Sequence, residues 1–114
     1  MSNSPNVLML MSDQHSKHHL GCYGDSLVRT PHLDRLASEG MRFDDAYTAS
    51  PVCVPSRMSF MSCRRPSATR VWNNHHLLHS GIPTWAHSLG AADIDTALIG
   101  RMHFNGPDQR HGFG

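Results

Sequence analysis

Cysteine is scarce in this sequence of 114 residues, and the three that occur form no recognisable framework. Cys22, Cys53 and Cys63 are odd in number and include no C-x-x-C pair. Zinc knuckles and closed disulfide scaffolds both need cysteines paired at defined spacings. The pattern therefore argues against both classes and favours a protein of a reducing compartment.

Long apolar runs are also missing. The apolar run at 7–11 is far shorter than the roughly 20 residues that a membrane-spanning helix needs. Residues 1–6 carry no Lys or Arg of the kind that opens a signal peptide. We therefore expect a cytoplasmic chain with no membrane span.

The chain has almost no excess of one charge, with 10 Lys and Arg against 9 Asp and Glu. Nucleic-acid binding relies on clustered Lys and Arg that release counterions from the phosphates, and only Arg64-Arg65 and Arg70 approach such a cluster. We expect no nucleic-acid partner. A hydrophobic fraction of 39% is too high for a disordered chain and allows one small globular domain. The 10 histidines are the compositional excess, and they suggest chemistry or metal affinity.

Apolar patterning predicts an α/β fold. Residues 7–11 and 97–99 are short continuous apolar runs, which are typical of strands buried on both faces of a parallel sheet. Alternation over 41–47 predicts a further strand.

Two helices have clear boundary signals. Thr30 and Pro31 are a typical N-cap and first helical residue, and Gly40 is expected to end that helix in the left-handed conformation. Thr84 is expected to cap a short helix over 85–89.

Another helix is expected to begin close to Cys53. Pro55 suits its first turn, and Val54, Met58 and Met61 recur at helical spacing. Cys53 would then lie at the positive end of a helix dipole.

Reactive side chains gather at the ends of the expected elements. They follow the first strand, open the helix near residue 53 and follow the last strand: Asp13, Gln14, Cys53, Arg57, Arg101 and His103. Ligands of open α/β sheets bind beyond the carboxyl ends of strands, and a helix N-terminus with a guanidinium favours a phosphate- or sulfate-like anion. A carboxylate with an amide oxygen suits a hard divalent cation. The sequence therefore predicts an oxyanion site with part of a metal site beside it.

Four segments of the chain resemble segments of the sulfatase family, in the alkaline-phosphatase superfamily, and occur in the same order as in that family. Cys53-Val54-Pro55-Ser56-Arg57 matches the C-x-P-S-R motif, whose cysteine becomes formylglycine. Residues 6–14 resemble the family's opening strand and metal pair, 30–37 its next helix, and 97–103 its G-K-x-H motif. The resemblance covers residues from about 6 to 114.

This resemblance implies a fold and an activity. The fold would be the N-terminal part of an alkaline-phosphatase/sulfatase-like α/β sandwich, with a mixed, mostly parallel sheet between helices. The activity would be hydrolysis of a sulfate ester: the hydrated formylglycine attacks sulfur, the alcohol leaves, and the hemiacetal then expels sulfate. A maturation enzyme that generates formylglycine from Cys53 would be a partner, and a small sulfated molecule the substrate.

The resemblance also implies a metal site. Asp13 and Gln14 would ligate Ca²⁺ or Mg²⁺ together with the modified Cys53. Most members have a second Asp where Gln14 stands, so this chain keeps the oxygen ligand and loses one negative charge.

The remaining roles fall on three side chains. Arg57 would hold the formylglycine hydrate and Arg101 would neutralise the sulfate. His103 would hydrogen-bond the hydroxyls of the nucleophile and act as a general base. Arg101 stands where the family usually has Lys, which retains the charge and adds a planar fork.

Length is the main departure from the family, whose members run to several hundred residues. They place their remaining metal ligands in the part that has no counterpart here. We therefore expect residues 1–114 to be a partial, truncated N-terminal catalytic domain, or one that a second chain completes. A phosphodiester or phosphonate monoester hydrolase of the same superfamily and an inactive truncated fragment are the alternatives.

Overall fold

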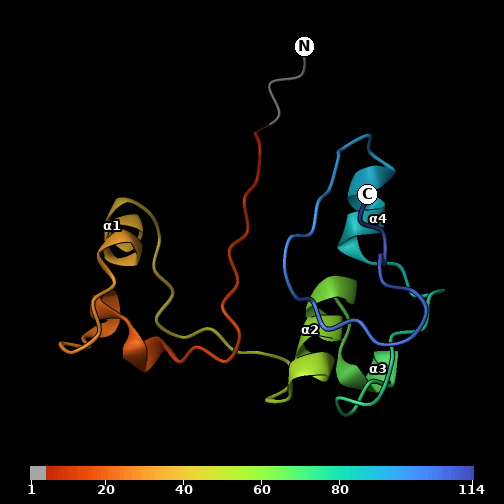
Figure 1. Cartoon of the computed structure of the whole chain (residues 1–114), viewed down its shortest axis with the longest axis horizontal. Helices are drawn as coiled ribbons and strands as arrows, with labels where there is room; N and C mark the ends of the chain where they lie inside the picture. Colours follow the sequence, from red (N-terminus) through yellow and green to blue (C-terminus); the bar gives the residue numbers. More distant parts are fainter. Residues whose placement is uncertain (1–4) are drawn as a thin grey trace. The chain divides into compact units, whose positions relative to one another are not determined.

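A computed structural model describes residues 5–114, which form two compact units (Figure 1). The first unit ends at Ala46 and the second runs from Tyr47 to Gly114. The expectation that the chain has no signal peptide rests partly on residues 1–4, which lie outside the described range. Within that range no helix is long and apolar enough to cross a membrane.

The first unit contains two short 3-10 helices and one α-helix. They are η1 (Lys17–His19), η2 (Gly21–Tyr23) and α1 (Pro31–Glu39). The start of α1 after Thr30 is confirmed. The expected left-handed stop is wrong, because Gly40 has φ −122° and ψ −150° and is extended. Its amide still donates to the Leu36 carbonyl at 3.0 Å, so the last turn closes without a positive φ.

Polar bonds, rather than an apolar core, hold this unit together. Asp34 Oδ1 accepts from the Cys22 amide at 2.7 Å and from the Thr30 hydroxyl at 3.0 Å. The Gly21 amide donates to the same hydroxyl at 2.8 Å, and a Cβ at Gly21 would lie only 2.5 Å from Asp34 Oδ2. None of the residues described in 5–46 is buried, and Leu36 on the apolar face of α1 is 61% exposed.

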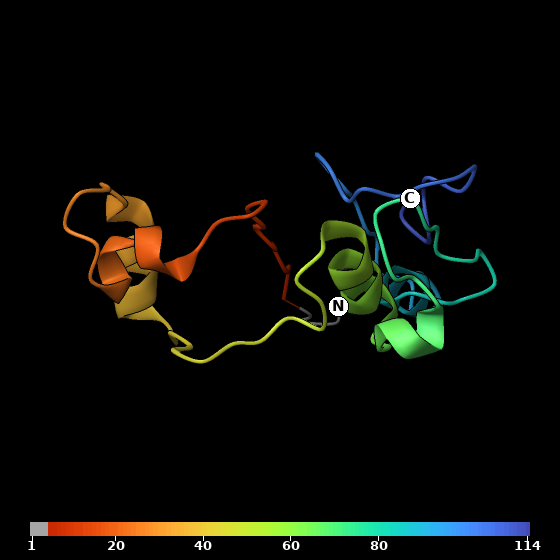
Figure 2. The ribbon, with the colours of Figure 1, turned by 90° about the horizontal axis from the view of Figure 1, so that it is seen from below.

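The second unit is built around α2 (Cys53–Ser62), which contacts α3 (Pro66–Thr69) and α4 (Trp85–Gly90). Both views show α2 with the later segments gathered beside it (Figures 1 and 2). The predicted start at Cys53 is confirmed, and α4 begins after Thr84 as expected.

The core of this unit consists of two clusters that share α2. Val54, Met58 and Met61, which recur at helical spacing along α2, are at most 1% exposed, as this spacing predicts for a buried helix face. Val54 and Met58 pack in one cluster, and Met61 packs in the other. Met102, which lies between Arg101 and His103, belongs to the second cluster. The segment that follows residue 97 is therefore anchored in the core.

The predicted strands are absent from residues 5–114, which is a correction to the expected sheet. Residues 7–11 have no regular secondary structure and their side chains are between 47% and 84% exposed, and Ile99 in the run 97–99 is 97% exposed. The stretch 41–47 bends instead of pairing, with the Phe43 carbonyl accepting from the Tyr23 hydroxyl at 2.6 Å. A strand needs a neighbouring backbone to satisfy its amides and carbonyls, and no described segment supplies one.

We predict that Asp34→Ala loosens the first unit and leaves the second intact. The substitution removes the acceptor of the Cys22 amide and the Thr30 hydroxyl, at a cost of about 1–3 kcal/mol. Hydrogen exchange should show the Cys22 amide exchanging faster while amides of α2 keep their rates. Unchanged protection of Cys22 would contradict the polar-network account.

We also predict that the second unit loses stability as the pH falls. His111 is 1% exposed and packs on the Phe104 ring. Burial lowers the pKa of His111, Asp108 opposes this, and His87 adds to it. Because the unfolded chain then binds more protons, stability is full above the unfolded pKa of about 6.5 and declines as the pH falls below it.

The check is the free energy of unfolding measured by denaturant titration from about pH 7.5 to 5.5 in the unaltered chain and in His111→Asn. Asn is chosen because it tolerates the positive φ of 42° at this position. The variant should show a shallower pH dependence. If the free energy of unfolding depends on pH equally steeply in the two proteins, the prediction is wrong.

Candidate functional site

The amino end of α2 carries Cys53 and lacks a cap of its own. Val52 occupies the N-cap position and has no side-chain acceptor, and the half-buried Cys53 is the first helical residue. The opening amides of a helix have no partner within it, so they need acceptors from elsewhere. Here the Val54 amide donates to Asn74 Oδ1 at 2.9 Å.

Arg57 follows Cys53 by one helical turn, which places both side chains on one face of α2. Only 8% of Arg57 is exposed. Its Nη1 donates to the Arg101 carbonyl at 3.0 Å and lies 4.0 Å from Met102 Sδ. The structure thus joins the C-x-P-S-R string directly to the segment that holds Arg101 and His103.

Arg101 and His103 lie side by side. Arg101 Nη2 is 2.9 Å from His103 Nδ1 and 3.2 Å from Nε2. Since a guanidinium only donates, the imidazole nitrogen that faces it accepts. Gly100 has φ +106° and His103 has φ +63°, so the backbone adopts left-handed conformations on both sides of Arg101. Such a conformation is uncommon for His and occurs often at functional sites.

Asp13 and Gln14 form an exposed turn in the first unit, and Gln14 has φ +56°. Their carboxylate and amide oxygens are donors that Ca²⁺ and Mg²⁺ accept, so the chemistry of the pair fits a hard cation. Two side chains do not complete the six to eight oxygens that Ca²⁺ takes. Within residues 5–114, no group of at least three His, Cys, Asp or Glu is arranged to hold a metal.

The predicted site residues thus fall into two sets. Four of them share the second unit, where α2 and the following segments bring them together: Cys53, Arg57, Arg101 and His103. Asp13 and Gln14 belong to the first unit, where they are neighbours in one turn.

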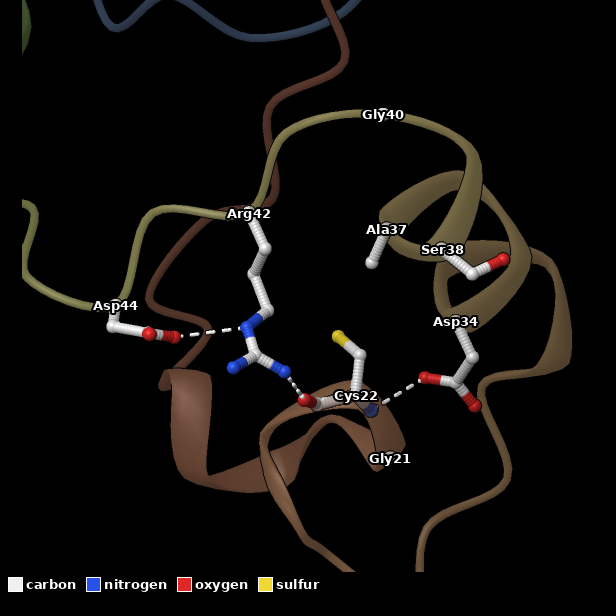
Figure 3. Close-up of a pocket in the computed structure, with 8 residues that line it drawn as sticks. All are labelled: Gly21, Cys22, Asp34, Ala37, Ser38, Gly40, Arg42 and Asp44. Carbon is white, nitrogen blue, oxygen red and sulfur yellow. Dashed lines mark hydrogen bonds and ion pairs between the residues drawn. The ribbon is translucent and has the colours of Figure 1, made fainter.

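A cavity of about 610 Å³ opens in the first unit (Figure 3). It lies between η2 and α1, and none of the predicted site residues lines it: Gly21, Cys22, Asp34, Ala37, Ser38, Gly40, Arg42 and Asp44. Arg42 Nε is 2.8 Å from Asp44 Oδ1, and Arg42 Nη1 donates to the Cys22 carbonyl. The aspartate holds the pKa of Arg42 above its usual value. Because none of the predicted site residues lines this cavity, we do not assign the oxyanion site to it.

Sequence reasoning missed two asparagines next to the site. Asn74 accepts from the Val54 amide, and Asn105 Nδ2 donates to the carbonyls of Asn74 and His76 at 2.7 and 2.8 Å. The signal for such a partner was the valine before Cys53, because a helix without a capping side chain needs an acceptor from elsewhere. Nothing in a single sequence indicates which residue provides it.

Comparison with known proteins agrees with the motifs. The sequence profile of the family described as Sulfatase matches residues 5–114. A choline-sulfatase of Rhizobium meliloti is 45% identical over 112 residues, which are 98% of this chain and 22% of that protein. The human iduronate 2-sulfatase is 38% identical, over 93% of this chain and 20% of its own length. The human steryl-sulfatase is 36% identical, over 90% of this chain and 19% of its own length.

The chain therefore spans about a fifth of the length of these relatives. The matched region still includes both strings that meet in the second unit. The family implies an alkaline-phosphatase-like α/β fold, although its sheet is not formed among residues 5–114. On the profile match and these identities, the chain belongs to the sulfatase family.

Proposed function

We propose that this chain carries the nucleophile-bearing part of a hydrolase for sulfate esters. The observation that supports the proposal most is the hydrogen bond from Arg57 to the Arg101 carbonyl. It brings the Cys53 helix and the Arg101–His103 segment onto one unit, as a shared oxyanion site requires. The proteins named choline-sulfatase, iduronate 2-sulfatase and steryl-sulfatase favour sulfate esters over phosphodiesters or phosphonates.

The proposed nucleophile is residue 53 after maturation. Once Cys53 has become formylglycine, the hydrated aldehyde supplies the oxygen that attacks sulfur. Cys53 is half-buried and opens α2, where the positive end of the helix dipole favours an anionic substrate. Arg57 lies one turn further along, and its bond to the Arg101 carbonyl fixes the plane of its guanidinium. In that orientation, Arg57 holds the hydroxyls of residue 53.

Arg101 and His103 divide the remaining work. Arg101 offers a planar fork of N–H donors that stabilises the negative charge of the sulfate oxygens. The imidazole nitrogen of His103 that accepts from Arg101 is its unprotonated one, so His103 can take a proton from a hydroxyl once the substrate has drawn the Arg101 guanidinium away from that nitrogen. We assign charge stabilisation to Arg101 and general-base catalysis to His103.

Asp13 and Gln14 are proposed as ligands of Ca²⁺ or Mg²⁺. Their oxygens match the preference of both ions, and a divalent charge would offset that of the sulfate. Residue 53 would be a further ligand. Other ligands must come from outside the set described here.

The direct test is sulfate release from an aryl sulfate ester by the protein produced together with a formylglycine-generating enzyme. We expect Cys53→Ala to abolish turnover because it removes the only source of the nucleophile. Cys63→Ala is the matched control, since Cys63 is exposed at the opposite end of α2. Equal loss in both variants, or faster cleavage of an aryl phosphodiester than of the sulfate ester, would contradict the proposal.

A second prediction concerns the charge at residue 101. Arg101→Ala should lower kcat by about 10²- to 10³-fold, the usual cost of losing one donor to a developing oxyanion. Arg101→Lys should keep most of the activity, because Lys retains the charge that the family normally places here. Steady-state kinetics on the three proteins decide this. If Arg101→Ala stays within about threefold of the unaltered protein, Arg101 does not stabilise the sulfate.

A further inference from the structure

We propose that Asn74 and Asn105 are positioning residues of the site. Together they form an asparagine bridge from the segment after His103 to the amino end of α2. This bridge sets where Cys53 stands relative to Arg101 and His103. Its meaning for catalysis rests on the proposed function, whereas the bridge itself is a property of the fold.

The first half of the bridge is a helix cap supplied from a distance. Val52 cannot cap α2, and Pro55 has no amide to offer. The Val54 amide is directed to Asn74 Oδ1 at 2.9 Å, and the Val54 side chain is fully buried. Asn74 therefore takes the role of the missing N-cap side chain and holds the turn in which Cys53 stands.

The second half of the bridge holds Asn74 in place. Asn105 Nδ2 donates to the Asn74 carbonyl at 2.7 Å and to the His76 carbonyl at 2.8 Å. A side-chain amide has two N–H donors, so both are used on the turn that presents Asn74. Both asparagines are half-buried, where an unmade hydrogen bond costs more than at the surface.

The bridge gains its positioning role from a second link nearby. Arg57 binds the Arg101 carbonyl, while Asn105 reaches Val54 through Asn74. Residues 101–105 are thus attached to α2 at two points, one turn apart. These two hydrogen-bonded links act together with the packing of Met102 in the core to fix the orientation of the segment. The position of Cys53 relative to Arg101 and His103 therefore depends on both links.

The test uses amide hydrogen exchange, followed by NMR on the isotope-labelled full chain. In Asn74→Ala, the Val54 amide should exchange about tenfold faster, as expected for the loss of one hydrogen bond. Asn105→Ala should also speed Val54, because it releases the turn that presents Asn74. Asn73→Ala is the matched control: Asn73 Oδ1 accepts from the nearby His75 amide in the same turn, and Val54 should keep its rate.

A conservative variant separates positioning from a general loss of stability. Asn74→Asp retains an oxygen acceptor for the Val54 amide, so we expect it to restore slow exchange. Amides toward the carboxyl end of α2, such as that of Ser62, should keep their rates in all variants. The bridge is contradicted if Val54 exchanges freely in the unaltered chain, if Asn74→Ala behaves as Asn73→Ala does, or if Ser62 accelerates as much as Val54.

Sulfate-ester kinetics then connect the bridge to the site. Asn105→Ala should lower kcat at least tenfold with little change in KM, since misplacing the reacting groups affects the transition state more than binding. Unchanged kcat would contradict the positioning role even if exchange supports the cap. Absence of turnover in the unaltered, matured protein would instead refute the proposed function, and exchange at Val54 would still decide whether the bridge exists.

Discussion

The buried guanidinium of Arg57 is the constraint on which the second unit depends. A charge that is only 8% exposed must be hydrogen-bonded, because burying it unpaired costs far more than any single apolar contact returns. Its bond to the Arg101 carbonyl requires the segment after residue 97 to lie along α2. Met102 then enters the core beside Met61, so the same constraint links packing to the arrangement of the site. Arg57 is thus both a candidate catalytic residue and the residue that links α2 to the segment after residue 97.

Helices could be predicted from the sequence much better than strands, and the reason is physical. The start of α1 at Pro31 and that of α2 at Cys53 depend on local signals, and both are confirmed. The runs 7–11 and 97–99 have the composition of strands, but a strand exists only when another backbone pairs with it. The chain spans about a fifth of its relatives' length, and no described segment pairs with those runs. The left-handed stop at Gly40 failed for a different reason, since glycine permits that conformation without requiring it.

The site was predictable as a list of residues, but not as a geometry. The sequence placed Cys53 and Arg57 at the start of one helix, and the structure confirms that helix. The contact of Arg57 with the Arg101 backbone, 44 residues away, has no signature in either motif. Asn74 and Asn105 were missed because a side chain that caps a distant amide looks like any other asparagine of a turn. A single sequence carries no signal that predicts long-range hydrogen bonds of this kind.

The measurement that tests the central claim most directly is peptide mass spectrometry of residue 53 in the protein isolated from its own cells. Cys53 opens α2, the buried guanidinium of Arg57 lies one turn further along, and Arg57 joins this helix to the segment of the Arg101–His103 pair. The proposal of sulfate hydrolysis requires the thiol of Cys53 to be replaced by an aldehyde. It predicts a tryptic peptide containing formylglycine at position 53, trapped as a hydrazone by a hydrazine reagent. A peptide that carries only the unmodified thiol of Cys53 would contradict it.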